Sequence, residues 1–390
     1  MTQPAGTLME MRETHEIHTS EVRSFLGCRR RWNMAYRNGF LPPESPKPLE
    51  LGIALHVGWE HFYSPEHWSK TTPEEKAQRA IDAFVAECEK QRLAYLKKTN
   101  QEGLISAEGD DYADRCELGI NMLNWYAEHV HPVKDKWFKP VYVEVPFQVP
   151  IVSPLGAPLT CPVDDGSCGQ LHPANAPVTF DGRIDMIIED LYQGGFLIWD
   201  HKSAAQIRKD DRVLRIDPQV GGYSWAMLVA MGLDIRGFVY VEYRKDYPKP
   251  PTALKRSYKG RLFTTDKNFG TDYKMYMETI ERLHPEGLKA GVYDEHLEWL
   301  KGKEAPRYHE RFPIIKGKKQ LLNFGESIYQ VAREMVRPDL AVYPSVGTYS
   351  CSGCAFYTPC EAMFNGEDYM HSLTTSYRNV KWEGRHELVG

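Results

Sequence analysis

The chain has 390 residues, of which 42% are hydrophobic and 26% charged, and its formal net charge at pH 7 is −5. These values are ordinary for a soluble globular protein, built either as one elaborated domain or as two units. No run of 18 apolar residues and no secretory signal is present, so we expect a cytoplasmic protein without membrane contact. The negative charge argues against nucleic-acid binding over the whole surface and would require a local basic surface instead.

The first 135 residues are mostly helical in their hydrophobic pattern. Phe25, Cys28 and Trp32 recur at helical spacing in the first predicted helix. The predicted helices of this part cover residues 19–38, 51–63, 73–97 and 111–130.

Strand patterns begin near residue 140. Residues 153–178 are rich in Pro, Gly, Asn and Asp, which indicates an inserted loop. The predicted elements around it are strands over 141–150, 178–190 and 196–204, a helix over 218–232 and a strand over 236–244. We expect that helix to be a crossover between two parallel strands.

These patterns predict an α/β fold, with a mixed central sheet flanked by helices and further helices added to it. An uncertain basic stretch lies near 313–319 in an otherwise helical part of the chain. The predicted division is a helical region over 1–139, an α/β core over 140–248, a helical region over 249–342, a cysteine-rich loop over 343–365 and a polar tail over 366–390.

Two carboxylates and a lysine follow apolar strand segments in the predicted core. Asp200 and Lys202 alternate on one strand and therefore share a face, and a hairpin would bring Asp185 opposite Asp200. Two close carboxylates favour a divalent cation with oxygen ligands, such as Mg²⁺ or Mn²⁺. The backbone carbonyl of His201 would add another oxygen. A lysine there would orient an attacking water or stabilise charge, as phosphodiester hydrolysis requires.

A D-x-K triplet alone is a weak signal, because an ordinary Asp–Lys pair on a surface strand has the same pattern. The surroundings favour a site. Asp200 and Lys202 directly follow the apolar run FLIW, and Asp185 lies within RIDMII.

Four cysteines lie near the two ends of the chain. Cys28 stands alone, and 322 residues separate it from a C-x2-C-x5-C group of Cys351, Cys354 and Cys360. In a reducing compartment such clustered cysteines favour metal binding over disulfides. Four thiolates suit either a [4Fe–4S] cluster or zinc, although zinc sites usually come as two close pairs. A second metal site is a further hypothesis for Cys161, Cys168 and His172 in the insertion.

These motifs resemble those of the PD-(D/E)XK nuclease superfamily, in its RecB-like branch. The order of motifs is GIALHVGWE, then GRID, then DHK, then QVGGY, within residues 51–223. The cysteine arrangement and its context SFLGCRRRW are similar to those of AddB-type and CRISPR-associated iron–sulfur exonucleases. The resemblance covers roughly residues 19–63, 140–245 and 343–364, and no phosphate-binding loop of a motor domain is present.

The resemblance implies a role for each matched residue. His56 would bind the metal together with Asp185 and Asp200, and Lys202 would be the catalytic lysine. Gln219 and Tyr223 would complete the site and position DNA. The four end cysteines would bind [4Fe–4S], and the adjacent basic residues, Arg29, Arg30 and Arg31, would face DNA.

The leading hypothesis is therefore a metal-dependent DNA exonuclease that acts on ends or single strands. It would serve recombination, repair, phage replication or CRISPR adaptation in a prokaryotic or phage-infected cytoplasm, with a protein partner or an oligomer possible. The alternative is a non-catalytic DNA-binding or partner-docking scaffold held by iron–sulfur or zinc. The sequence leaves open the cleavage polarity, the strand preference, endonuclease against exonuclease action and the oligomeric state.

Overall fold

A mixed seven-stranded sheet forms the centre of the computed structural model, which describes residues 13–42, 47–98, 111–233 and 235–379. Its order is β1-β5-β6-β7-β10, and β3 and β4 also pair with β5. The strands are β1 (His15–His18), β3 (Phe138–Pro150), β4 (Thr160–Cys161), β5 (Ala176–Asp190), β6 (Phe196–Ala204), β7 (Ile235–Arg244) and β10 (His309–Ile315). This arrangement confirms the predicted α/β class.

The long strand β5 organises the sheet because it has different neighbours along its length. On one edge it pairs antiparallel with β3 from Thr179 to Asp190. On the other edge β1 pairs with Val178–Asp181, and β6 pairs with Met186–Glu189. The stretch of β5 between these two partners is therefore left open on that edge.

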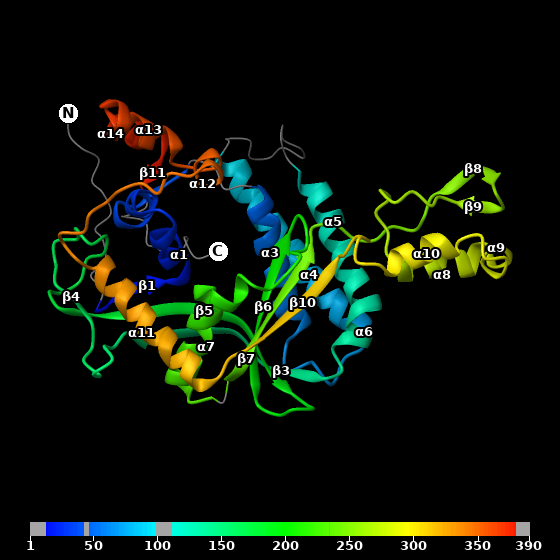
Figure 1. Cartoon of the computed structure of the whole chain (residues 1–390), viewed down its shortest axis with the longest axis horizontal. Coiled ribbons are helices and arrows are strands. Elements are labelled where there is room, and N and C mark those ends of the chain that lie inside the picture. Colours follow the sequence, from blue (N-terminus) through cyan, green and yellow to red (C-terminus); the bar gives the residue numbers. More distant parts are fainter. Residues whose placement is uncertain (1–12, 43–46, 99–110, 234, 380–390) are drawn as a thin grey trace.

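Helices cover both faces of the sheet (Figure 1). Side chains of α1 (Thr19–Gly27), α7 (Pro218–Met231) and α11 (Lys318–Met335) contribute to one core, and those of α3 (Lys47–Phe62), α4 (Pro73–Lys98) and α5 (Tyr112–Trp125) to the other. The connection from β6 through α7 to the parallel strand β7 is the predicted crossover. Gly221 of α7 allows α11 to approach closely, since an added Cβ would lie 2.2 Å from the Phe324 ring.

Several short elements extend these layers. The chain after α1 continues as α2 (Arg29–Trp32), a π-helical turn (Asn33–Arg37) and β2 (Phe40–Leu41). A π-helical turn (Tyr126–Val130) and α6 (His131–Lys134) follow α5, and a 3₁₀ turn (Leu214–Ile216) precedes α7. A small separate core joins β9 (Arg261–Phe263) to α8 (Tyr273–Leu283), α9 (Pro285–Lys289) and α10 (Asp294–Lys301), and β8 (Ala253–Tyr258) pairs with β9. These elements extend from the sheet in Figure 1.

Some predicted elements were wrong in extent or type. The helix predicted over 19–38 breaks at Cys28, whose backbone is extended with φ −163° and ψ 110°. Strand β10 lies in the region predicted as helical, because its residues pair with β7. The cysteine-rich loop contains α12 (Thr348–Ser352) and α13 (Tyr357–Asn365). The segment after Asn365 forms α14 (Tyr369–Ser376) and β11 (Arg378–Asn379), while the rest of the predicted tail lies outside the described residues.

In the described part of the chain, none of the helices has the length and apolar character needed to cross a bilayer.

The buried His309 on β10 makes stability depend on pH. Burial and the neighbouring Arg311 lower the pKa of His309 well below its ordinary value of 6.5, and neither ring nitrogen has a hydrogen-bond partner. Below pH 6.5 the unfolded chain therefore binds a proton that the folded protein does not, and stability falls with pH. The loss of stability contributed by His309 grows as the pH falls further below 6.5.

We expect the variant His309→Phe to lose less stability than the unchanged protein between pH 7.5 and pH 5.5. Urea denaturation at the two pH values measures the difference, with the exposed His371→Phe as the control. An equal loss in His309→Phe and the unchanged protein would show that His309 is protonated in the fold.

Candidate functional site

The site lies where the ladder between β5 and β6 ends. The last pair is Met186 with Trp199, so that Asp185 and Asp200 are the next residues on the two strands. Beyond that pair, the backbone N–H of His201 donates to Oδ2 of Asp185 at 2.7 Å. The Asp185 carboxylate thereby provides the acceptor that a buried backbone N–H requires.

Asp200 and Lys202 share one face of β6, as alternation predicts. Lys202 Nζ lies 3.0 Å from Oδ1 and 2.9 Å from Oδ2 of Asp200. The Asp200 side chain is 1% exposed, whereas Lys202 retains 30% exposure. A buried carboxylate is thus covered by a lysine side chain that remains partly exposed.

Helix α7 brings Gln219 to the same carboxylate. Asp217 caps this helix by accepting from the Gln219 backbone N–H at 2.7 Å, and Pro218 suits its first position. The Gln219 side-chain amide then donates to Oδ1 of Asp200 at 2.8 Å. Arg23 of α1 donates to Asp217 at 2.5 Å and to Oε1 of Gln219 at 3.2 Å, which orients that amide.

Helix α3 brings His56 to the other carboxylate. His56 Nδ1 lies 3.4 Å from Oδ2 of Asp185, and the His56 side chain is 31% exposed. One turn further along α3, the Trp59 ring stacks on His201 with a centroid separation of 5.8 Å. The His201 ring in turn hydrogen-bonds the Tyr243 hydroxyl at 2.9 Å, so the residue between Asp200 and Lys202 is fixed in the core.

Burial sets the charge state of these groups. It lowers the pKa of His56 to about 4, with a smaller effect in the same direction from Lys202. Burial raises the pKa of Asp200 to about 6, although Lys202 opposes this, and burial also raises the pKa of Asp185. For Lys202 the carboxylates outweigh burial and raise its pKa. At neutral pH His56 is therefore a neutral imidazole, and a charged Lys202 lies beside the Asp200 carboxylate.

The chemistry of these donors suits a divalent cation, although among the described residues His56, Asp185 and Asp200 do not bring one ligand atom each within 4.8 Å of one another. Oδ2 of Asp200 is buried and accepts no hydrogen bond, although Lys202 lies nearby. The imidazole of His56 is in the neutral form that binds metals. Carboxylate and carbonyl oxygens with one imidazole suit Mg²⁺ or Mn²⁺.

A family model described as the PD-(D/E)XK nuclease superfamily matches residues 18–361. The chain belongs to this superfamily. Its members are generally nucleases that use divalent metals. No curated protein matches the chain.

The PD-(D/E)XK core contains a further carboxyl group that the sequence patterns did not single out as a site. Glu144 of β3 stands opposite Asp185, since its neighbours Val143 and Val145 pair with Met186 and Ile184. Burial and then Asp185 and Glu60 raise the pKa of Glu144 to about 7. An acidic residue inside an otherwise apolar strand was the available signal, but its alignment with Asp185 depends on strand register.

Tyr223, the last residue of the predicted nuclease motifs, is largely inside the protein. It is 8% exposed and contacts the Phe147 ring at 5.3 Å. Burial, followed by the Asp200 charge, raises the pKa of its hydroxyl to about 12. The pKa of the Tyr223 hydroxyl is therefore sensitive to the charge on Asp200. Direct contact of Tyr223 with DNA stays a prediction.

The two ends of the described chain meet around the cysteines. Ser345 N–H donates to Sγ of Cys28 at 3.4 Å, and Arg30 contacts Sγ of Cys360 at 3.7 Å. Cys351 lies on α12, Cys360 lies on α13, and the Cys354 N–H donates to the Cys351 carbonyl. Within the described residues, these four thiols do not form a group with all sulfur atoms within 4.8 Å.

The arginines next to Cys28 contribute to this contact between chain ends. Arg29 pairs with Glu334 and lies over the ring of Tyr343, 4.9 Å from its centroid. Arg30 lies at the same distance over the Phe364 ring. Their predicted contact with DNA is not tested by these interactions.

Glu144 has a left-handed backbone, with φ 50°, which disfavours most side chains but is tolerated by asparagine. We therefore expect Glu144→Asn to raise the free energy of unfolding by roughly 0.5–1 kcal/mol. The substitution also removes the Glu144 charge, which faces Asp185 and Glu60, and this too raises the free energy of unfolding. Chemical denaturation without divalent metal measures the change.

The variant Glu144→Ala serves as the matched control, because it removes the carboxyl group and still disfavours positive φ. It should gain less stability than Glu144→Asn. A loss of stability in both variants would mean that the Glu144 carboxyl group stabilises the fold.

Proposed function

We propose that this protein is a metal-dependent DNA exonuclease of the RecB-like branch, acting on ends or single strands. The observation that carries the proposal is the fork between β5 and β6. There Asp185 is bound by the His201 backbone, and Asp200 is contacted by Lys202 and Gln219. Membership of the superfamily supports hydrolysis of DNA as the general activity.

Asp185, Asp200, His56 and the backbone carbonyl of His201 would hold Mg²⁺ or Mn²⁺. When bound, such an ion lowers the pKa of water and offsets the charge on the phosphate. Lys202 is held in its charged form by the carboxylates, and its partial exposure lets it reach the scissile phosphate. It would orient the attacking water and stabilise charge that develops on the phosphate oxygens.

Gln219 would act as a positioning residue. Its amide donates to Asp200 on one side and accepts from Arg23 on the other. This fixes one Asp200 oxygen and leaves Oδ2 without a hydrogen bond. Tyr223, one turn further along α7, would support the DNA strand from the edge of the site.

The first test is hydrolysis of end-labelled linear DNA with Mg²⁺ or Mn²⁺. We expect Lys202→Ala and Asp200→Asn each to reduce the rate by at least about 100-fold, because each removes a charge needed at the reacting phosphate. The control is Lys139→Ala, which removes another lysine paired with a carboxylate, Glu189, at the far end of β5. Activity that persists in both site variants would reject this site.

DNA substrates of different topology distinguish an exonuclease from an endonuclease. An exonuclease degrades linear DNA and leaves covalently closed circles intact, whereas an endonuclease cuts both. Single- and double-stranded forms of each topology determine strand preference. Binding of DNA without hydrolysis under any of these conditions would favour the non-catalytic scaffold.

We also propose that Cys28, Cys351, Cys354 and Cys360 bind a [4Fe–4S] cluster that fastens the chain ends. The contacts of Cys28 with Ser345 and of Arg30 with Cys360 support this pairing of distant segments. Each thiolate of such a cluster binds a different iron, so the four sulfur atoms need not approach as closely as ligands of one ion. Closing a loop of this length would contribute a few kcal/mol of stability.

Anaerobically purified protein should contain equal amounts of iron and inorganic sulfide. Cys360→Ser should lose both and unfold at a lower temperature, because the link between the chain ends is removed. Cys116→Ser, a cysteine of α5, is the matched control and should keep its iron. Stoichiometric zinc in place of iron, bound by four sulfur atoms, would contradict the cluster.

A further inference from the structure

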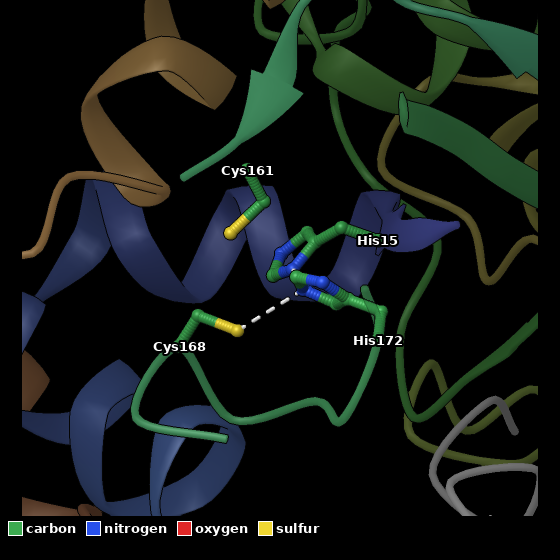
Figure 2. A group of neighbouring side chains, drawn as sticks. All are labelled: His15, Cys161, Cys168 and His172. Carbon is green, nitrogen blue, oxygen red and sulfur yellow. Dashed lines mark hydrogen bonds between the residues drawn. The ribbon is translucent and has the colours of Figure 1, made fainter. Parts of the chain in front are cut away.

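A second group of metal-binding side chains lies away from the fork. The residues are His15, Cys161, Cys168 and His172, and all four are buried. One possible ligand atom from each lies within 4.8 Å of the others. Figure 2 shows the two sulfur atoms and the two imidazole rings directed toward one another.

Two contacts within the group lie close to tetrahedral spacing. Nδ1 of His15 lies 3.1 Å from Nε2 of His172, which lies 3.3 Å from Sγ of Cys168. Bonds of about 2.0–2.3 Å to a tetrahedral zinc ion would separate its ligand atoms by roughly 3.3–3.8 Å. All other separations stay within 4.8 Å, so shifts of about 1 Å would let the four atoms bind a single ion.

The surroundings of His172 select the atom that would bind. Its Nδ1 lies 3.0 Å from the Pro173 carbonyl, the acceptor that a protonated Nδ1 requires. The lone pair then resides on Nε2, which faces His15 and Cys168. Hydrogen bonding of the second ring nitrogen to a carbonyl is the usual support for a histidine that ligates zinc.

The loop that carries Cys168 and His172 is fastened to β1 beside His15. The Gln170 side chain donates to the Glu16 carbonyl at 2.6 Å and accepts from the Glu16 N–H at 2.9 Å. It thus pairs with the outer edge of β1 as a neighbouring strand would. Gly169, with φ 98°, allows the sharp turn between Cys168 and Gln170.

The group joins both edges of β5. His15 belongs to β1 and pairs with Val178, whereas Cys161 belongs to β4 and pairs with Ala176. Cys161 and Cys168 also lie in the main hydrophobic core, where polar groups without strong partners are costly. A bound cation would satisfy both thiolates and both imidazoles at once.

We propose that His15, Cys161, Cys168 and His172 bind a structural zinc ion. Two thiolates balance its charge, and a buried tetrahedral set of two sulfur and two nitrogen ligands favours zinc. The full set of four ligands leaves no position for water, as in structural zinc sites. The ion would clamp β1 and the β4–β5 loop around the start of β5.

The decisive measurement is zinc X-ray absorption on the unaltered full-length protein, produced in zinc-supplemented medium and purified under anaerobic conditions. We expect one zinc ion per chain, bound by two sulfur and two nitrogen atoms. Absence of zinc would overturn the proposal. So would zinc bound only by oxygen and nitrogen, which would place it in the carboxylate site, or zinc bound by four sulfur atoms, which would place it at the end cysteines.

Variants assign the ion to these residues. Cys168→Ser and His172→Ala should each lose the zinc and lower Tm by several degrees, because the loop is released from β1. Cys88→Ala alters another buried cysteine and should retain one zinc per chain. Retention of zinc with the same ligands in Cys168→Ser, or a Cys161–Cys168 disulfide in the anaerobic protein, would reject the site.

Discussion

The end of hydrogen bonding between β5 and β6 is the constraint on which the candidate active site depends. β6 pairs with β5 only as far as the Met186–Trp199 pair, and β1 pairs with the same edge of β5 only over Val178–Asp181. The backbone groups of β5 between Asp181 and Met186 therefore have no strand partner on that edge. The Asp185 carboxylate replaces one missing strand partner, because it accepts a hydrogen bond from the His201 N–H. This carboxylate is therefore held by the fold before any ligand binds.

The charges at this fork explain why a cation belongs there. Asp185 and Asp200 carry two negative charges when ionised, and Lys202 neutralises only one of them. Burial opposes the remaining charge, which is why the pKa of both carboxyl groups is raised. A phosphodiester would be repelled by this surplus. A divalent cation would both relieve the repulsion between the carboxylates and allow the phosphate to approach, so that substrate binding and metal binding would be coupled.

Local sequence patterns predicted the elements whose conformation is determined by neighbouring residues in the sequence. Strand β6 and helix α7 follow directly from an apolar run and from an N-cap followed by proline. Strand β1 is only four residues long and exists because β5 offers it an edge. Strand β10 contains Pro313, which is tolerated since β10 is an edge strand. These two strands, and the alignment of Glu144 with Asp185, depend on register between distant segments, which local patterns do not contain.

The segment from β1 to α2 links the two cysteine groups to the active-site fork. It is held beside the β4–β5 loop near His15 and beside the C-terminal segment at Cys28. Helix α1 lies between these two points, and its Arg23 contacts the side chain that contacts Asp200. A short helix fastened at both ends would have little freedom to shift, which would keep Arg23 beside Gln219. If both proposed metal centres form, their effect on hydrolysis would be mechanical: each would preserve the orientation of Gln219 without touching the substrate.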